Sequence, residues 1–266
     1  MAPDSRRSWV DSMPEAYDRH LGPVVFAPFA KDLADRIAGF SPSRVLELAA
    51  GTGLVTRELL RTCPGAQVVA TDLNPAMVDY GSRQVPAATW RRADAQSLPF
   101  PDAGFDLVAC QFGIMFFPDK PAAVAEARRV LVPGGRLVFN TWGTLDSHRF
   151  GATLMDCLRR AFPADPPKFL NDIPHGYADP ARITADVTAG GLVCDSLDTI
   201  TLTGTADAAD VALGFCTGTP VRAEIEARGD LDATTALIKS EMRARLGDGP
   251  VTGTMSAHVV VAHRPG

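Results

Sequence analysis

The sequence contains few cysteines and no spacing that would pair them. Its five cysteines are Cys63, Cys110, Cys157, Cys194 and Cys216, so the total is odd and no CxxC pair occurs. A disulfide framework needs paired cysteines, and a zinc site needs cysteines or histidines at short spacing. We therefore expect buried free thiols in a reducing compartment and no metal site.

Long apolar runs are missing too. No stretch approaches the roughly 18 apolar residues that cross a membrane, and the polar first twenty residues do not resemble a signal peptide. These absences predict a cytoplasmic protein without a membrane span.

Clusters of basic residues, which would indicate a nucleic-acid partner, do not occur. The 26 lysines and arginines are outnumbered by 31 aspartates and glutamates, and the formal net charge is −5. Electrostatic binding to a phosphate backbone requires the opposite balance. Adjacent arginines form isolated pairs at residues 91–92, 128–129 and 159–160, which we interpret as solvated surface.

The segment from residue 43 to residue 142 alternates short apolar runs with helical segments. The runs predict strands at 44–49, 67–72, 89–93, 105–111 and 136–142. Between them, helices are expected over 54–62, from Asn74-Pro75 onward, and over 121–131, where Pro133-Gly134-Gly135 follows. This rhythm is typical of βαβ units and a parallel sheet.

After Trp142 the rhythm breaks. Helices are expected over 149–162 and 180–189 around a proline-rich loop at 163–167, a strand over 192–202, mostly helix over 206–245, and a final strand over 254–263. We therefore divide the chain into an N-terminal helical segment (1–42), a core (43–142), a cap or lid insertion (143–191) and a C-terminal part of the sheet (192–266). A lid role for the insertion is a hypothesis, because such a segment leaves the sheet near the strand C-termini.

The strongest local signal is the glycine-rich turn Glu47-Leu-Ala-Ala-Gly-Thr-Gly53 between a strand and a helix. Small residues let a ligand approach the backbone, and the helix N-terminus presents free N–H groups. Asp72 ends the next strand about 25 residues later, where a carboxylate can bind both ribose hydroxyls. The alternatives are a turn that merely packs strand on helix and a helix-capping aspartate.

The turn departs from the dinucleotide fingerprint G-x-G-x-x-G/A, because Thr56 occupies the third small position. The pattern E-x-A-x-G-x-G resembles instead motif I of class I methyltransferases, with Ala49 in place of the usual first glycine. An NAD-dependent oxidoreductase is therefore the disfavoured alternative.

The resemblance continues over residues 44–142, through segments 71–77, 92–100, 105–113 and 131–137. It implies a Rossmann-like, seven-stranded, mostly parallel sheet flanked by helices, with the last strand antiparallel and a helical cap after strand five. It also implies S-adenosylmethionine as the cofactor. The implied cofactor-binding residues are Tyr17, Glu47, Ala49, Ala50, Gly51, Gly53, Asp72, Leu73, Met77, Asp94, Ala95, Gln96, Gln111 and Phe112.

Within that set the resemblance implies individual roles. Asp72 would bind the ribose, with Leu73 and Met77 near the adenine; Asp94 would accept from the adenine amino group, unless it only caps a turn. Ala95 would offer its backbone N–H. Gln111 and Phe112 would lie beside the methionine portion, although Phe112 is equally suited to the core. Tyr17 resembles a tyrosine that many relatives place over the cofactor; alternatively, its helix simply packs on the sheet.

Leu98-Pro-Phe-Pro-Asp102 and the residues after Phe112 are most similar to ubiquinone and menaquinone C-methyltransferases and their relatives, and the likeness fades after Trp142. We expect O- or C-methylation of an aromatic or apolar metabolite. Methylation of a protein or nucleic acid, and a cofactor-binding protein without catalysis, remain alternatives. The oligomeric state, monomer or homodimer, stays open.

The catalytic residues are not identified by the sequence. A sulfonium methyl group is intrinsically reactive, so a general base helps only when the acceptor carries a proton of high pKa. Candidates for such a base are His20 and His175, and His148 is a third. His258 and His263 lie in the last expected strand and are interpreted as structural. A histidine in a loop is more often an ordinary surface residue.

Overall fold

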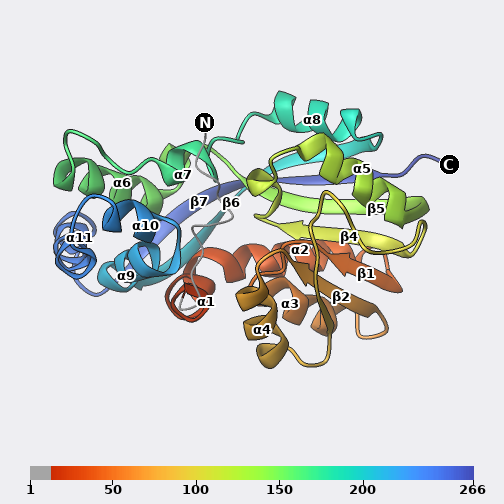
Figure 1. Ribbon diagram of the computed structural model, residues 1–266, viewed down its shortest axis with the longest axis horizontal. Helices are drawn as coiled ribbons and strands as arrows, with labels where there is room; N and C mark the ends of the chain where they lie inside the picture. The colour runs from red at the N-terminus through yellow and green to blue at the C-terminus, as the bar shows by residue number, and fades with distance from the viewer. Residues whose placement is uncertain (1–12) are drawn as a thin grey trace. The chain divides into compact units, whose positions relative to one another are not determined.

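A seven-stranded sheet organises the chain, and the computed structural model describes residues 13–266 (Figure 1). The strands are β1 (Arg44–Glu47), β2 (Gln67–Asp72), β3 (Thr89–Arg92), β4 (Phe105–Gln111), β5 (Leu131–Trp142), β6 (Val193–Asp207) and β7 (Pro250–His263). Their order in the sheet is β3-β2-β1-β4-β5-β7-β6. Strands β1 to β5 pair in parallel, whereas β7 runs antiparallel to β5. The expected fold class is confirmed.

The described chain divides into two compact units. The sheet unit comprises residues 29–142, 177–200 and 257–266, and the helical unit comprises residues 13–28, 143–176 and 201–256. Strands β6 and β7 contribute to both units. Within each unit their side chains pair in antiparallel register, Thr199 with His258 in the sheet unit and Thr205 with Thr252 in the helical unit.

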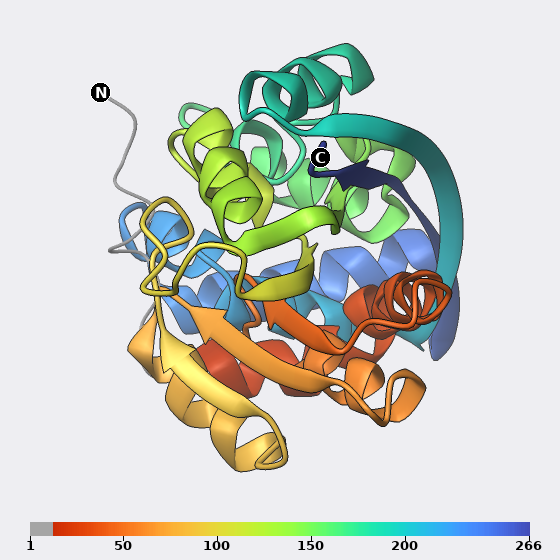
Figure 2. The ribbon, with the colours of Figure 1, turned by 90° about the vertical axis from the view of Figure 1, so that its right-hand side faces the viewer.

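In the sheet unit, helices cover both faces of the sheet. Helices α2 (Ala27–Ala38) and α3 (Leu54–Thr62) bury apolar side chains against one face, where Leu33 and Leu59 are fully buried with Val45 of β1. Helices α5 (Lys120–Val130) and α8 (Pro180–Ala189) lie on the other face (Figure 2). Strand β1 pairs with β2 on one side and β4 on the other, so the chain order reverses there. Ligands of open α/β sheets bind at the strand C-termini beside this reversal.

Local sequence signals set the helix starts in the sheet unit. Helix α4 (Pro75–Gln84) begins as predicted: the Asn74 side chain accepts from the backbone N–H of Ala76, and Pro75 occupies the first helical position. Asp119 caps α5 in the same way by accepting from the N–H of Ala122. The caps define where α4 and α5 begin, so the loops before these helices lie at the C-terminal ends of β2 and β4.

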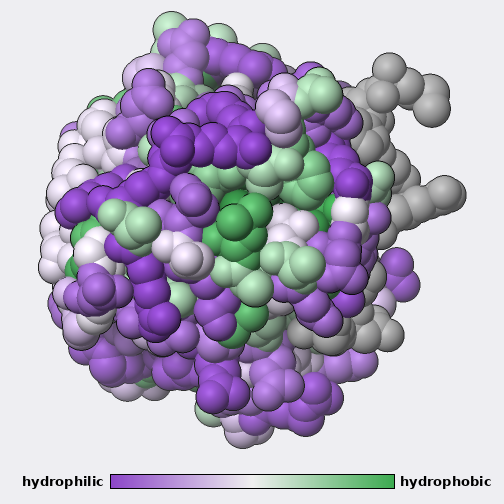
Figure 3. All heavy atoms as spheres, turned by 90° about the vertical axis from the view of Figure 1, so that its left-hand side faces the viewer, coloured by the Kyte–Doolittle hydropathy of each residue, from purple (hydrophilic) through white to green (hydrophobic). Residues whose placement is uncertain are grey.

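The helical unit contains α1 (Met13–Ala16), the π-helix η2 (Tyr17–Phe26), α6 (Arg149–Ala161), α7 (Phe169–Asp172), α9 (Ala208–Gly218), α10 (Val221–Glu226) and α11 (Leu231–Leu246). The π-helix was not anticipated; Pro23 lies inside it and supplies no N–H, and the N–H of Ala27 bonds to the carbonyl of Gly22. Helix α9 packs closely on η2, because an added Cβ at Gly218 would lie 2.7 Å from the backbone nitrogen of Tyr17. The face of α6, α9 and α11 is mostly hydrophilic around a small hydrophobic area (Figure 3).

Three expectations need correction. Strand β5 already begins at Leu131, and residues 132–135 bulge out of it, because Leu131 pairs with Phe105 while Arg136 pairs with Leu107. Strand β6 extends five residues beyond its expected end, whereas the mostly helical stretch expected over 206–245 is confirmed as three helices. The interpretation of Arg129 as solvated surface is wrong, since its guanidinium binds four other residues.

No helix among the described residues 13–266 combines the length and apolar character needed to cross a membrane.

Candidate functional site

The glycine-rich turn joins β1 to α3 with an unusual backbone. Ala49, Gly51 and Gly53 have φ angles of 51°, 57° and 90°, in the left-handed region that favours glycine. The N–H of Ala50 bonds to the carbonyl of Thr71, which fixes the turn against the end of β2. An added Cβ at Gly51 would find no atom within 4 Å, so the turn faces open space there. This backbone suits the close approach of a ligand.

Asp72, the last residue of β2, anchors the same turn. One carboxylate oxygen accepts from the N–H of Gly51 at 2.9 Å, and the other accepts from the N–H of Asn74 at 2.8 Å. Burial raises the pKa of Asp72, and these backbone hydrogen bonds oppose the rise. The aspartate therefore joins the glycine-rich turn to the start of α4 and holds its carboxylate at the C-terminal edge of the sheet.

Glu47, the last residue of β1, is a buried carboxyl with 1% of its surface exposed. The Thr56 hydroxyl donates to it at 2.6 Å, which gives the threonine at the third fingerprint position a role that glycine could not fill. Desolvation is the main cause that raises the pKa of Glu47 to about 8; the Thr56 hydrogen bond opposes this rise and nearby Asp72 adds to it. Among the described residues no cation offsets these effects. The pair of carboxyl groups therefore suits a ligand that brings positive charge.

The residues that follow β1 and β4 approach each other closely, and the missing side chain of Gly113 leaves the space that the Ala49 methyl group occupies. An added Cβ at Gly113 would lie 2.5 Å from the Cβ of Ala49 and 2.8 Å from the Cys110 sulfur. Real Cβ contacts are not that short, so Gly113 makes room for the alanine that replaces the family's first glycine.

We expect Gly113→Ala to destabilise the fold by roughly 2 kcal/mol through overpacking. The φ of −102° at Gly113 is open to alanine, so the collision is the cause. Adding Ala49→Gly should restore part of the loss in urea unfolding, because it removes one colliding atom. The control is Ala103→Gly, which relieves a similar positive φ of 54° elsewhere. An equal rescue by Ala103→Gly would contradict this account.

The residues expected near the adenine lie at the C-terminal ends of β2 and β3. Leu73 is an exposed large hydrophobic residue, 36% accessible, and Met77 is buried in the first turn of α4. Asp94 accepts from the N–H of Gln96 at 2.9 Å, so its turn-capping role is present beside any ligand role. Ala95 is buried. The Gln96 carbonyl oxygen accepts from the N–H of Asp119 at 2.8 Å, which ties this turn to α5.

The end of β4 carries Gln111 and Phe112. Phe112 is buried with φ of 49°, and its N–H donates to the buried side chain of Asn140 at 3.0 Å. Its ring stacks on Trp142 at 3.7 Å between centroids, with the edge of Phe29 5.3 Å away. Sequence reasoning missed Asn140, whose signal is a polar side chain inside an apolar strand. Strained backbone at Phe112 and Ala49 is a feature that clusters at functional sites.

The remaining candidates lie in the helical unit. Tyr17 begins η2, and its ring stacks on Phe26 at 4.6 Å. Burial is the main cause that lowers the pKa of His20. His148 caps α6 by accepting from Gly151, and burial lowers its pKa to about 3. Burial also lowers the pKa of His175 to about 4; its Nδ1 lies 2.8 Å from the carbonyl of Gly143, so that nitrogen is the donor.

His258 and His263 were expected to be structural, and their contacts in the sheet unit are with neighbouring elements. The Nε2 of His258 lies 3.0 Å from the carbonyl of Ala178, and His263 pairs with Asp195.

The sheet order and the turn first define a class, a Rossmann-like domain with a nucleotide-type site at its strand C-termini. Residues 46–139 match the family described as Methyltransferase domain. The demethylmenaquinone methyltransferase of Mycolicibacterium vanbaalenii is 36% identical over 162 residues, which cover 57% of this chain and 69% of that protein. The chain therefore belongs to the class I S-adenosylmethionine-dependent methyltransferases.

Relatives within this family differ in their acceptors. The malonyl-[acyl-carrier protein] O-methyltransferase of Halorhodospira halophila is 37% identical over 155 residues, 54% of this chain and 49% of that protein. This chain spans about half the length of the first curated relatives it matches, from 48% to 58%. The solved structure of Haemonchus contortus phosphoethanolamine N-methyltransferase 2 with S-adenosyl-L-methionine has a TM-score of 0.60 at 17% identity, covering 98% of this chain and 59% of that one. That likeness shows the shared fold.

Proposed function

We propose that this chain binds S-adenosylmethionine at the C-terminal ends of β1, β2 and β4 and transfers its methyl group to a small molecule. The observation that carries the proposal is the bond from Gly51 to Asp72, which joins the open glycine-rich turn to a carboxylate at the end of β2. Family membership supports the choice of cofactor. The cofactor supplies a methyl group on a sulfonium cation, which reacts with a nucleophile held in line with it.

The roles of this chain's own residues follow from their chemistry. Asp72 would accept hydrogen bonds from the ribose hydroxyls with lone pairs that its two backbone donors leave available. Asp94 would accept from the adenine amino group and Ala95 would donate its N–H, while Leu73 and Met77 would cover the base. Glu47, which keeps its proton near neutral pH in the chain alone, would supply negative charge once the cationic end of the cofactor lowers its pKa.

The acceptor is proposed as a small aromatic or quinol-type molecule, methylated on carbon or oxygen. The similarity to demethylmenaquinone methyltransferase supports a quinol, but the similar malonyl-carrier O-methyltransferase shows that relatives act on other acceptors. A phenol or an activated carbon must lose a proton, so a base among His20, His148 and His175 stays a prediction. Tyr17 as a cover for the cofactor also stays a prediction.

The decisive experiment is calorimetric titration with S-adenosylhomocysteine and with NAD, on wild type and on Asp72→Ala. We expect binding of the first ligand alone, weakened at least about 100-fold in the variant, because two hydrogen bonds to a charged group are lost. Asp79→Ala, an exposed aspartate of α4, is the matched control and should bind normally. Binding of NAD alone would instead support an oxidoreductase.

A second step tests turnover. The protein is incubated with S-adenosylmethionine and a panel of hydroquinones, catechols and carboxylic acids, and products are read by mass spectrometry for one added methyl group. Cofactor binding without turnover on any acceptor class would favour a cofactor-binding protein that lacks catalysis.

A further inference from the structure

The segment between β3 and β4, residues 93–104, has no helix or strand of its own, yet it carries the turn expected to recognise adenine. This turn is closed locally by the N–H of Ser97, which bonds to the carbonyl of Asp94 at 3.0 Å. A loop of this kind needs support from a rigid element to hold a hydrogen-bonding pattern in place. Helix α5 supplies that support.

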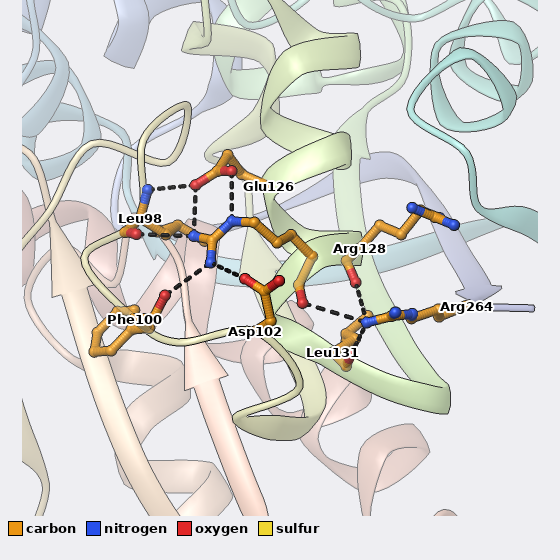
Figure 4. A network of polar contacts seen from close by, with 8 residues as sticks. Leu98, Phe100, Asp102, Glu126, Arg128, Leu131 and Arg264 are labelled. Atoms are coloured by element: carbon orange, nitrogen blue, oxygen red, sulfur yellow. Dashed lines mark hydrogen bonds and ion pairs between the residues drawn. The ribbon is translucent and has the colours of Figure 1, made fainter. Parts of the chain in front are cut away.

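Arg129, in the last turn of α5, binds this segment with three of the five N–H groups of its guanidinium, and Figure 4 labels the partners of this network. One terminal nitrogen donates to the carbonyl of Phe100 and to Asp102, both at 2.8 Å, and the other donates to the carbonyl of Leu98 at 2.9 Å. The remaining donors bind both oxygens of Glu126 at 2.8 Å. All five donors of the planar group are therefore satisfied, which lysine with three donors on one atom could not reproduce.

Glu126 and Gln96 add two further attachments. The N–H of Leu98 donates to Glu126 at 2.7 Å, so the residue is held through both its N–H and its carbonyl. At the other end of the turn, Gln96 accepts from the N–H of Asp119, the capping residue of α5. Both ends of the turn at 94–98 are therefore fixed to one helix. Arg129 can thus influence the position of this turn without contacting a ligand.

Adenine recognition depends on such fixation because its hydrogen-bonding edge is directional. Adenine offers an amino donor at C6 and an acceptor at N1, whereas hypoxanthine offers an acceptor at C6 and a donor at N1. A carboxylate acceptor and a backbone N–H at fixed positions pair with the first pattern and oppose both groups of the second. A turn that can shift would lose much of that discrimination.

We propose that Arg129, with Glu126, is a positioning residue for base selection, which fixes the turn at 94–98 on α5 so that the site accepts adenine and rejects a 6-oxopurine. This inference rests on the proposed cofactor function. It gives Arg129 a role in ligand specificity from a place outside the residues expected to touch the cofactor.

The experiment measures dissociation constants of S-adenosylhomocysteine and S-inosylhomocysteine for wild type and Arg129→Gln. We expect wild type to prefer the adenosyl ligand by about 100-fold or more, since two hydrogen-bonding positions are reversed. In Arg129→Gln that preference should fall about tenfold, as expected from losing one well-placed hydrogen bond. Hydrogen exchange of residues 94–104 should become faster in the same variant.

The matched control is Arg128→Gln on the same helix, because only the backbone carbonyl of Arg128 enters the network, where it accepts from Arg264 (Figure 4). This variant should keep the full base preference. If Arg129→Gln does not fold, Glu126→Gln replaces it as the test, because it removes only the charged partner and should lower the preference in the same direction.

Folded variants at Arg129 or Glu126 that weaken both ligands equally, and so keep the wild-type preference, would overturn the inference and leave the network a purely structural role. If wild type binds neither ligand, the proposed cofactor function itself fails and the inference fails with it. A lowered preference in Arg129→Gln, together with the full wild-type preference in Arg128→Gln, supports both the cofactor function and the inference.

Discussion

We expect the free energy of unfolding to fall as the pH rises from 7 to 8.5, with Glu47 as the main source. Burial raises the pKa of this carboxyl in the folded chain to about 8 from an ordinary value of 4.5. Between these values the folded state binds a proton that the unfolded state has released, so stability decreases with pH. Its contribution is complete below pH 4.5 and is lost as the pH rises through 8. The full change is on the order of 5 kcal/mol.

Glu47→Gln tests this directly, because the amide keeps the shape and can still accept from Thr56 but does not titrate. Urea unfolding from pH 7 to pH 8.5 should show a much flatter profile than wild type, and the variant should be the more stable protein at the alkaline end. Glu58→Gln, in the same unit and paired with Arg61 at the surface, is the control and should follow wild type. A Glu47→Gln profile parallel to wild type would refute the prediction.

Helix and strand bounds near the glycine-rich turn could be read from the sequence because their signals are local. The predicted bounds of α3, β2 and β4 are those observed, and Asn74 caps α4 as expected. Apolar periodicity and capping residues act within a few residues of chain, so tertiary packing had little to override.

The support of the site could not be read in this way, because its partners are distant in sequence. Arg129 was placed with surface arginine pairs, yet its contacts are with residues 98–102 across 27 to 31 positions, as well as with Glu126. Likewise, Gly113 is explained only by the Cβ of Ala49 on another strand. Neither pairing has a sequence spacing that predicts it.

Thr56 has a role in the structure that the sequence did not indicate. In the sequence it only excluded the dinucleotide fingerprint, since the third small residue was missing. In the fold its hydroxyl donates to the buried Glu47 carboxyl at 2.6 Å. Thr56 therefore distinguishes this turn from the dinucleotide fingerprint and also donates a hydrogen bond that stabilises the buried Glu47 carboxyl.

The helical unit should respond to pH in the opposite direction, through His148 and His175. The two rings lie 5.5 Å apart between centroids. Desolvation and the neighbouring His175 lower the pKa of His148 to about 3, and desolvation lowers that of His175 to about 4. Because folded values lie below the ordinary 6.5, the unfolded chain gains protons first, and stability present above pH 6.5 is lost as the pH falls. For fully buried His148 the loss between pH 7 and pH 5 is roughly 2 kcal/mol.

His148→Asn separates titration from structure, since its side-chain oxygen can still accept from the N–H of Gly151 and cap α6. We expect unfolding between pH 7 and pH 5 to lose about half of its acid dependence in this variant, with His175 responsible for much of the rest. His263→Asn in the sheet unit, where the ring pairs with Asp195, is the control and should retain the wild-type slope. An unchanged slope in His148→Asn would mean that the buried cap is not what makes the helical unit sensitive to acid. With Glu47 weakening the sheet unit toward alkaline pH, the two buried groups together would limit maximal stability to the interval between about pH 5 and 7.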